Sequence, residues 1–145
     1  MAINENYIQY EIRISNDGDL NKKLNLIGFN IIDSALLKHN LLDESSPIFS
    51  VINKDNSKIY INGEELNPFS LWYKFQSKGK YNIKIEINEK LNNLSFLLYK
   101  LRNVTKIDLS HLNTDEVKSL EGTFEECLDL EELNLENINT KKMKN

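Results

Sequence analysis

The two histidines and the single cysteine are the residues of this chain that most often serve in catalytic or metal sites. Neither His39 nor His111 belongs to a metal-binding spacing such as H-x-x-x-H or C-x-x-C. Cys127 follows Phe124 at the spacing of one helical turn, which places it on an apolar face, where a free cysteine acts as a small core residue. We therefore expect no catalytic residue, no metal and no cofactor, and we expect both histidines at the surface or in loops.

A run of acidic residues near the end of the chain is the second candidate for chemistry. Paired carboxylates can bind a divalent cation or hydrolyse a glycoside. A carboxyl group on a polar face gives no reason to expect a raised pKa, however, and runs of acidic residues are usually solvated surface. The functional alternative is a patch that attracts a basic partner. The run comprises Glu121, Glu125, Glu126, Asp129, Glu131, Glu132 and Glu136, and we take Glu121, Glu125, Glu126, Glu132 and Glu136 as candidate partner-binding residues.

Trp72 is the remaining candidate contact residue. It adjoins Tyr73, so one of the two must face outward if the strand is regular. An exposed aromatic side chain can bind a partner, whereas a half-buried tryptophan on a sheet is the commoner case.

The elements that would position these residues come from an internal repeat between Lys90 and Met143, in which one pattern recurs after about 26 residues. Apolar residues at i, i+3, i+7 and i+10 predict one helix face in each copy, and an alternating pair predicts a short strand after it. Neither helix-turn-strand unit can bury its apolar edge alone, so the copies are expected to stack. The aligned positions include Leu91 with Val117, Leu94 with Leu120, Leu98 with Phe124, Ile107 with Leu133, and Leu109 with Leu135.

The second copy resembles the repeat of the BspA-type leucine-rich-repeat proteins. Its segment Phe124-Glu-Glu-Cys127-Leu-Asp-Leu130-Glu-Glu-Leu133-Asn-Leu135-Glu-Asn-Ile138-Asn139-Thr140 is similar to units that read roughly M-x-x-M-F-x-x-C-x-x-L-x-x-L-D-L-S-x-F-x-T. The first copy matches in part, with Leu101 in place of the cysteine. Residues 26–28, 58–66 and 79–85 are similar to the leading β-rich segment of protist members. The resemblance implies a protein-binding surface, and often attachment to a cell surface.

The first 88 residues are predicted to form a small, mainly antiparallel β domain. Alternation of apolar and polar residues predicts most of its strands, and Asn62-Gly63 predicts a tight hairpin. The predicted elements are strands at 7–14 and 23–27 paired with each other, a helix at 29–42, strands at 48–52 and 57–61, the hairpin of 59–61 with 64–66, and a hairpin of 69–75 with 81–87.

We therefore predict an α+β fold in two parts. Residues 1–88 are the β domain, which caps the start of a leucine-rich-repeat solenoid formed by two helix-turn-strand repeats at residues 89–145. No Gly- or Pro-rich linker separates the parts near Asn88, so they are expected to share a core.

Composition limits the class of partner. The net charge of -4 and a pI near 5.3 argue against binding nucleic acid, whose phosphates require clustered Lys and Arg. No stretch reaches the roughly 20 apolar residues needed to insert into a bilayer. The first residues resemble no leader, which favours a cytoplasmic protein, or an extracellular one if a leader has been removed.

These observations predict a non-enzymatic protein-protein interaction or scaffolding module. One alternative is an adhesin or surface antigen, and another is an enzyme with a site in the N-terminal domain. Two repeats leave an apolar edge uncovered at Leu133, Leu135, Ile138 and Met143. We expect further repeats, a second copy of the chain or a protein partner to cover that edge.

Overall fold

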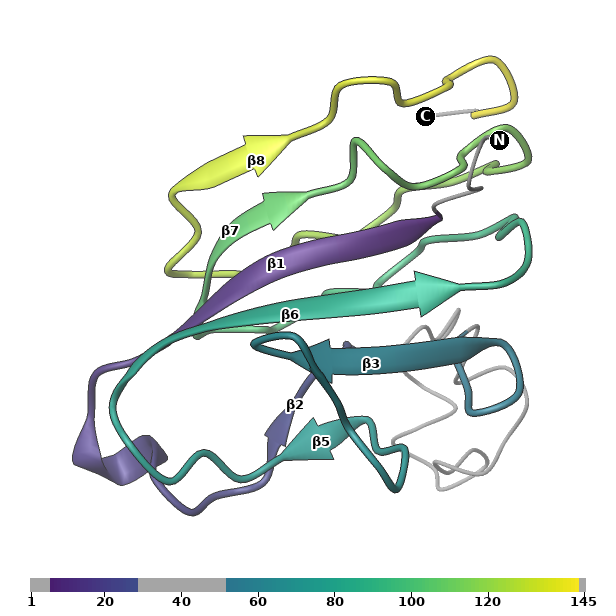
Figure 1. Ribbon diagram of the computed structural model, residues 1–145. Coiled ribbons are helices and arrows are strands. Elements are labelled where there is room, and N and C mark those ends of the chain that lie inside the picture. The colour runs from purple at the N-terminus through teal and green to yellow at the C-terminus, as the bar shows by residue number, and fades with distance from the viewer. Residues whose placement is uncertain (1–5, 29–51, 144–145) are drawn as a thin grey trace, which may run out of the picture.

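The computed structural model of this chain describes residues 6–28 and 52–143. Its main layer is a six-stranded sheet in the order β4-β3-β6-β1-β7-β8 (Figure 1). All neighbouring strands are antiparallel except β7 and β8, which are parallel. The strands are β1 (Tyr7–Ile14), β3 (Ser57–Ile61), β4 (Glu64–Glu65), β6 (Gly79–Ile87), β7 (Val104–Asp108) and β8 (Glu132–Asn134). A second sheet joins β2 (Leu24–Asn25) to β5 (Trp72–Tyr73), and a short 3-10 turn covers Asp17–Asp19.

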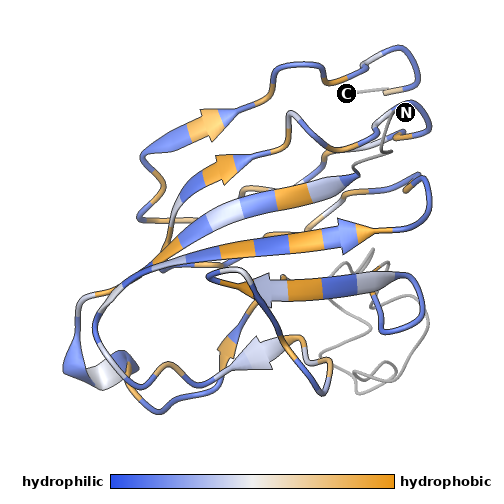
Figure 2. Cartoon of the chain, viewed as in Figure 1, coloured by the Kyte–Doolittle hydropathy of each residue, from blue (hydrophilic) through white to orange (hydrophobic). Residues whose placement is uncertain are grey.

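Strand β1 lies between β6 and β7 in the sheet, and its residues alternate strictly between its two faces. Ile8, Tyr10, Ile12 and Ile14 are buried, while the residues between them face the outer side. Strand β6 alternates in the same way, which Figure 2 shows as successive orange and blue bands. The Tyr10 hydroxyl is buried and donates a hydrogen bond to the carbonyl oxygen of Leu26, so its polar atom is satisfied.

One core joins the two parts of the chain. Ile85 and Phe75 from the first part belong to the same buried cluster as Leu94 and Leu98 from the second. The sheet also crosses the boundary, because β1 pairs with β6 on one side and with β7 on the other. The predicted shared core is therefore confirmed, since residues of both parts pack in one cluster. The division of the chain into residues 1–88 and 89–145 stays a prediction.

The predicted α+β class is wrong, because the described residues form β strands and turns and contain no α-helix. In place of the two repeat helices, residues 94–101 and 120–127 form successive tight turns. A positive φ recurs every four residues in each segment, at Phe96 (59°) and Lys100 (62°) and again at Gly122 (64°) and Glu126 (59°). Right-handed helix does not tolerate these angles.

The physical reason lies in where the backbone N–H groups bond. Within each turn segment the hydrogen bonds span three residues, as from Leu97 N to Leu94 O at 3.0 Å. Other N–H groups of the first copy bond to the second copy instead of to their own turn, as from Leu94 N to Ser119 O at 3.1 Å. A turn of four residues also places apolar side chains on one side at nearly the spacing of a helix with 3.6 residues per turn, so the apolar pattern did not distinguish the two.

Two predicted strand pairings are also wrong. The hairpin of 69–75 with 81–87 does not form, because β5 pairs with β2 while both edges of β6 are occupied by β1 and β3. Residues 23–27 do not pair back on 7–14, because β1 pairs with β6 and β7 on its two edges and β2 pairs with β5.

Other local predictions are confirmed. Strand β1 has the predicted bounds, and β3 folds back on β4 through Asn62 and Gly63, whose φ angles are 50° and 86°. The helix predicted at 29–42 lies outside the described residues, as does the strand predicted at 48–52 except for Ile52.

Candidate functional site

Two equivalent segments lie side by side at the end of the sheet, and we call residues 91–116 the first unit and residues 117–142 the second unit. Their strands are parallel, with Ile107 opposite Leu133 (Figure 1). This pairing confirms the alignment of the two residues in the repeat. A backbone bond from Glu131 N to Thr105 O at 2.7 Å continues the contact beyond the strands.

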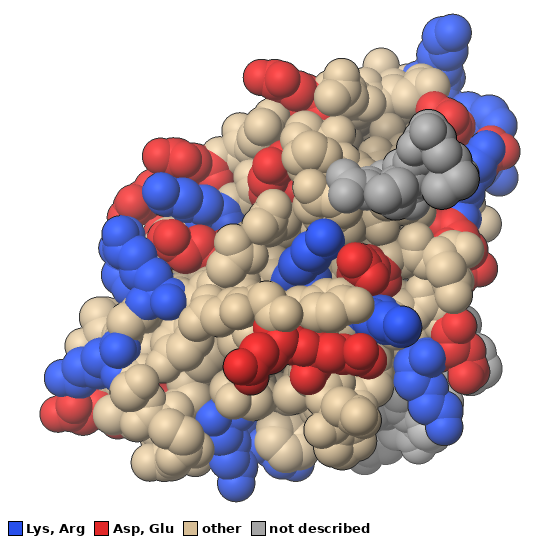
Figure 3. Space-filling view, viewed as in Figure 1, with Lys and Arg blue, Asp and Glu red and all other residues tan. Residues whose placement is uncertain are grey.

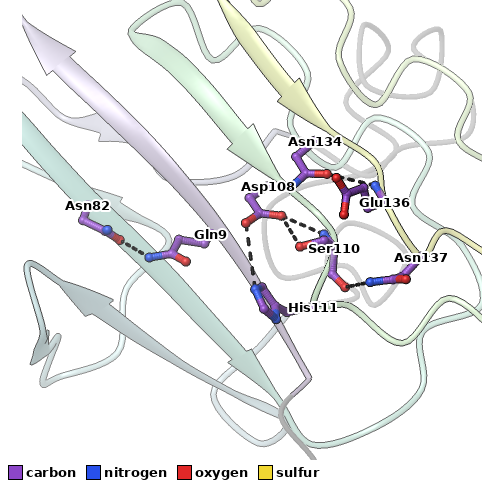
Figure 4. A network of polar contacts seen from close by, with 8 residues as sticks. All are labelled: Gln9, Asn82, Asp108, Ser110, His111, Asn134, Glu136 and Asn137. Carbon is purple, nitrogen blue, oxygen red and sulfur yellow. Dashed lines mark hydrogen bonds and ion pairs between the residues drawn. The ribbon is translucent and has the colours of Figure 1, made fainter.

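Side chains shape the corners of both units in the same way. At three equivalent positions an oxygen of Asn, Asp or Ser accepts a hydrogen bond from the N–H two residues later, as in an Asx turn. Two of these turns, at Asp108 and Asn134, are visible in Figure 4. The pairs are Asn93 with Ser95 and Ser119 with Glu121, Asp108 with Ser110 and Asn134 with Glu136, and Asn113 with Asp115 and Asn139 with Lys141.

Asn113 and Asn139 thus stabilise equivalent turns of the two units. Thr114 Oγ1 accepts a hydrogen bond from Asn139 N at 2.8 Å and joins the two units. Lys142 Nζ also reaches across to the Glu116 carboxylate, and this contact lowers the pKa of Glu116.

A hydrogen-bonded ladder joins the turn segments of the two units, and most of its backbone donors are on the first unit; at its start one bond runs the other way, from Lys118 N to Asn92 O at 2.9 Å. Four N–H groups of the first unit donate to four carbonyl oxygens of the second. The bonds are Leu94 N to Ser119 O (3.1 Å), Phe96 N to Glu121 O (2.8 Å), Leu98 N to Thr123 O (3.2 Å) and Lys100 N to Glu125 O (3.0 Å). The equivalent N–H groups of the second unit belong to Leu120, Gly122, Phe124 and Glu126, and none of these donates a hydrogen bond within the described residues.

Beside this row of donors, the second unit exposes three large apolar side chains. Leu128 is 68% exposed, Leu133 is 41% exposed and Leu135 is 38% exposed, and β8 is the last strand of the sheet. Of the four residues predicted to be uncovered, Leu133 and Leu135 are exposed, whereas Ile138 and Met143 pack partly against the core. The sequence analysis did not identify Leu128 as exposed. Its position in the repeat is occupied by Arg102 in the first unit, and a charged residue at the equivalent position could have indicated exposure.

We define the open edge as β8, residues 120–128 and Leu135. It combines backbone N–H groups that donate no hydrogen bond to any described residue with exposed leucines on the same unit. Such an edge is a template for pairing with another chain.

The acidic residues predicted to bind a partner surround this unit but do not form one cluster. Glu121, Glu125, Glu126, Glu132 and Glu136 are all exposed. Glu126 accepts a hydrogen bond from the Tyr99 hydroxyl at 3.0 Å and lies 4.0 Å from Lys100 Nζ. The described residues contain no group of three or more carboxylate, histidine or cysteine side chains arranged to hold a metal ion.

Glu131, beside the open edge, and Cys127, within it, are bonded to other parts of the fold. Glu131 pairs with Arg13 at 3.1 Å, which lowers the pKa of the glutamate. Cys127 Sγ donates to Leu98 O at 3.1 Å, and burial raises the pKa of its thiol. The predicted reading of Cys127 as a small packing residue agrees with its contact with the core.

Trp72 lies apart from the acidic residues. It belongs to β5 in the small sheet, which is at the opposite end of the molecule from β8 (Figure 1). Its ring is 38% exposed, and Lys23 Nζ lies 4.4 Å from the ring centroid. The structure therefore does not bring Trp72 and the acidic residues into one site.

His111 is exposed, as predicted, and its ring stacks on Tyr7 with centroids 4.6 Å apart. Its Nε2 lies 4.0 Å from an Asp108 carboxylate oxygen, and the other oxygen of that carboxylate accepts from Ser110 (Figure 4). His39 lies outside the described residues. On the face of the molecule shown in Figure 3, acidic and basic side chains are interspersed.

Compared with known proteins, the chain matches no family model, no curated protein and no solved structure. The open edge is therefore interpreted from its own geometry, and the resemblance to BspA-type repeats stays a prediction. No helix among the described residues has the length and apolar character to cross a membrane.

Proposed function

We propose that this chain is a non-enzymatic protein-binding module whose open edge receives a segment of another protein. The observation that carries the proposal is that equivalent groups of the first and second units differ in hydrogen bonding and burial. The turn-segment N–H groups of the open edge occupy positions that are hydrogen-bonded in the first unit, and Leu133 and Leu135 occupy positions that are buried there, at Ile107 and Leu109. The same backbone geometry that binds the second unit to the first is thus presented again, without an occupant among the described residues.

Main-chain pairing would supply the affinity of such a contact. An extended segment that adds to a sheet edge gains backbone hydrogen bonds, and its alternate side chains enter apolar pockets. Leu133 and Leu135 are available to contact those side chains, because both are exposed and lie in or directly after β8, the last strand of the sheet. Leu128 adds an exposed apolar surface to the same unit.

Charge favours a basic partner. The stretch from Ser119 to Thr140 contains seven acidic residues and no Lys or Arg. Exposed carboxylates attract a positively charged segment and speed its encounter, and salt weakens that attraction. The motif between Phe124 and Thr140, with its likeness to BspA-type repeats, also supports a binding role, and membership of that family is part of this proposal.

A peptide library displayed on phage tests the proposal when it is selected against the immobilised chain. We expect enriched peptides with alternating apolar residues and added Lys or Arg. Leu133→Gln should abolish their binding, while Trp72→Gln serves as a matched control because the two side chains are exposed to nearly the same extent, 41% and 38%. Peptides that bind both variants equally, or that lose binding only to Trp72→Gln, would contradict the assignment of the site to the open edge.

The role of charge has its own variant. Glu121, Glu125 and Glu132 are exposed, so replacing all three with Gln should change the free energy of unfolding by no more than about 1 kcal/mol. The same variant should bind the selected peptides more weakly and with less dependence on salt. Unchanged affinity at low salt would show that the acidic residues do not contribute.

A further inference from the structure

The outer face of the main sheet, which is turned away from the core, carries a row of hydrogen-bonding side chains across five strands. Asn134, Asp108 and Gln9 lie opposite one another on β8, β7 and β1, and Lys84 and Tyr60 continue the row on β6 and β3. Neighbouring strands are about 4.8 Å apart, so the row extends over roughly 19 Å. We infer that this face binds a linear, uncharged oligosaccharide, which is a ligand distinct from the protein segment proposed for the open edge.

A second row of side chains lies two residues along each strand from the first. Its members are Glu132, Lys106, Glu11 and Asn82 on β8, β7, β1 and β6. Every residue of the two rows is at least partly exposed, and together they line two shallow grooves with volumes of about 390 Å³ each. Gln9 and Asn82 belong to both grooves, so the grooves form one continuous surface.

The amide side chains of this surface are held in place and still have hydrogen-bonding groups to offer. Gln9 Nε2 donates to Asn82 Oδ1 at 3.0 Å (Figure 4), which leaves the Gln9 oxygen and the Asn82 nitrogen without a partner among the described residues. Asn134 Oδ1 accepts from Glu136 N at 2.9 Å, and the Asn134 amide nitrogen donates to no described residue. The surface therefore offers donors at Asn82 and Asn134 and an acceptor at Gln9, and their positions are fixed before a ligand binds.

A chain of sugars matches this set of side chains, because each sugar hydroxyl group both donates and accepts hydrogen bonds. Adjacent hydroxyls of one ring can bond to an amide donor on one strand and to a carboxylate acceptor on the next. The carboxylate acceptors of the two rows are Glu11, Asp108 and Glu132, and Lys84 and Lys106 add donors. One sugar ring covers only a small part of a row that extends over roughly 19 Å, so an oligosaccharide satisfies more of these groups than a single sugar does.

The charges of the grooves disfavour an anionic ligand. Four carboxylates and two lysines line them, so a phosphate or a sulfated sugar would be repelled. The lysines lie beside carboxylates, with Lys84 Nζ 3.5 Å from Glu86 and with Lys106 between Glu132 and Glu11 in its row. A neutral ligand whose hydroxyl groups bond to both signs of charge fits this arrangement.

The side chains of the two rows are also unlike those of a protein interface. The centre of such an interface contains aromatic and aliphatic side chains and few charges. The two rows contain one aromatic residue, Tyr60, and no aliphatic residue. The outer face therefore differs in chemistry from the open edge, where exposed leucines are available to a protein segment.

A glycan array probed with the full chain tests the inference. The array carries linear hexasaccharides of glucose, xylose, mannose, galactose and N-acetylglucosamine, together with the corresponding single sugars and sulfated hexasaccharides. We expect binding to at least one neutral hexasaccharide, and weaker binding to its single sugar and to its sulfated form. Binding to no neutral hexasaccharide, or stronger binding to sulfated ones, would overturn the inference.

NMR titration of the full chain with the hexasaccharide that binds most tightly locates the site. The side-chain amide signals of Gln9, Asn82 and Asn134 should shift. The amide signals of Gln76 and Asn93 should not, because these residues line neither groove. Shifts confined to residues outside the two grooves would also overturn the inference.

A pair of matched variants tests the contribution of one amide. Asn134→Ser removes the amide nitrogen but keeps an acceptor for the turn, as Ser119 does at another corner of the same unit. We expect this variant to bind the hexasaccharide roughly two- to tenfold more weakly. Asn93→Ser is the control, because Asn93 makes the same kind of turn away from the grooves. Equal affinities of the two variants would contradict the assignment of the site.

The double variant Gln9→Ala with Asn82→Ala should lose more affinity, by over about tenfold, because it removes the pair of amides that both grooves share. Undiminished binding by this variant would overturn the inference. Binding of peptides at the open edge is tested separately by the library selection, so neither result decides the other.

Discussion

The first and second units have nearly the same apolar pattern and very different burial. Ile107 is 2% exposed in the first unit, and Leu133, its partner in the second, is 41% exposed. The first unit lies between β1 and the second unit, whereas the described residues place nothing beyond β8. The comparison shows that an apolar repeat determines which way a side chain points, while the neighbouring elements determine whether it is covered.

The largest expected effect comes from truncating the paired residues separately. Ile107→Ala should lower the free energy of unfolding by about 2 to 5 kcal/mol, because it leaves a cavity in a buried site. Leu133→Ala should cost about 1 kcal/mol or less, since much of that side chain is already in contact with water. Urea denaturation of both variants gives the two values, and equal losses would mean that the open edge is covered in solution.

A smaller effect is expected where the units meet in the turn layer. Gly122 has φ of 64°, and a Cβ there would overlap the ring of Phe96. Gly122→Ala should therefore lower the free energy of unfolding by about 1 to 3 kcal/mol, since a positive φ alone costs roughly 1 to 2 for a residue with a side chain. Chemical denaturation measures the loss.

Gly18→Ala is the matched control, because no atom lies within 4 Å of the added Cβ. We expect it to change stability by no more than about 0.5 kcal/mol. If Gly122→Ala were as harmless as the control, the packing of the first unit on the second would be looser than the structure indicates.

The smallest expected effect concerns the ion pair between the units. Lys142 holds the pKa of Glu116 below its ordinary value of 4.5. A carboxyl group with a lowered folded-state pKa contributes stability above its unfolded pKa, and that contribution disappears as pH falls through the folded value. Stability should therefore decline slightly below pH 4.5, and Glu116→Gln should remove this part of the decline.

Thermal unfolding followed from pH 7 downward in steps measures this change. Glu121→Gln is the control, because the side chain of Glu121 makes no ion pair within the described residues. A decline with pH that is the same in both variants would assign the dependence to other groups, such as Glu131, whose pKa Arg13 lowers.

Several features of this fold were available from sequence because they depend on near neighbours. The alternation from Tyr7 to Ile14 determines which side chains of β1 enter the core, and Asn62-Gly63 determines a turn with two positive φ angles. The recurrence of one pattern determines that Ile107 aligns with Leu133, since equivalent units stack in register. The candidate acidic residues were also placed correctly at the surface.

Tertiary structure alone decided the state of the turn segments and the pairing of the strands. A helix and a series of four-residue turns bury apolar residues at almost the same spacing, and the choice between them depends on whether backbone N–H groups bond within a segment or to its neighbour. Here Leu94, Phe96, Leu98 and Lys100 donate to the second unit, and the turns prevail. Strand β5 likewise pairs with β2 because both edges of β6 are occupied, a competition between distant segments that no local pattern records.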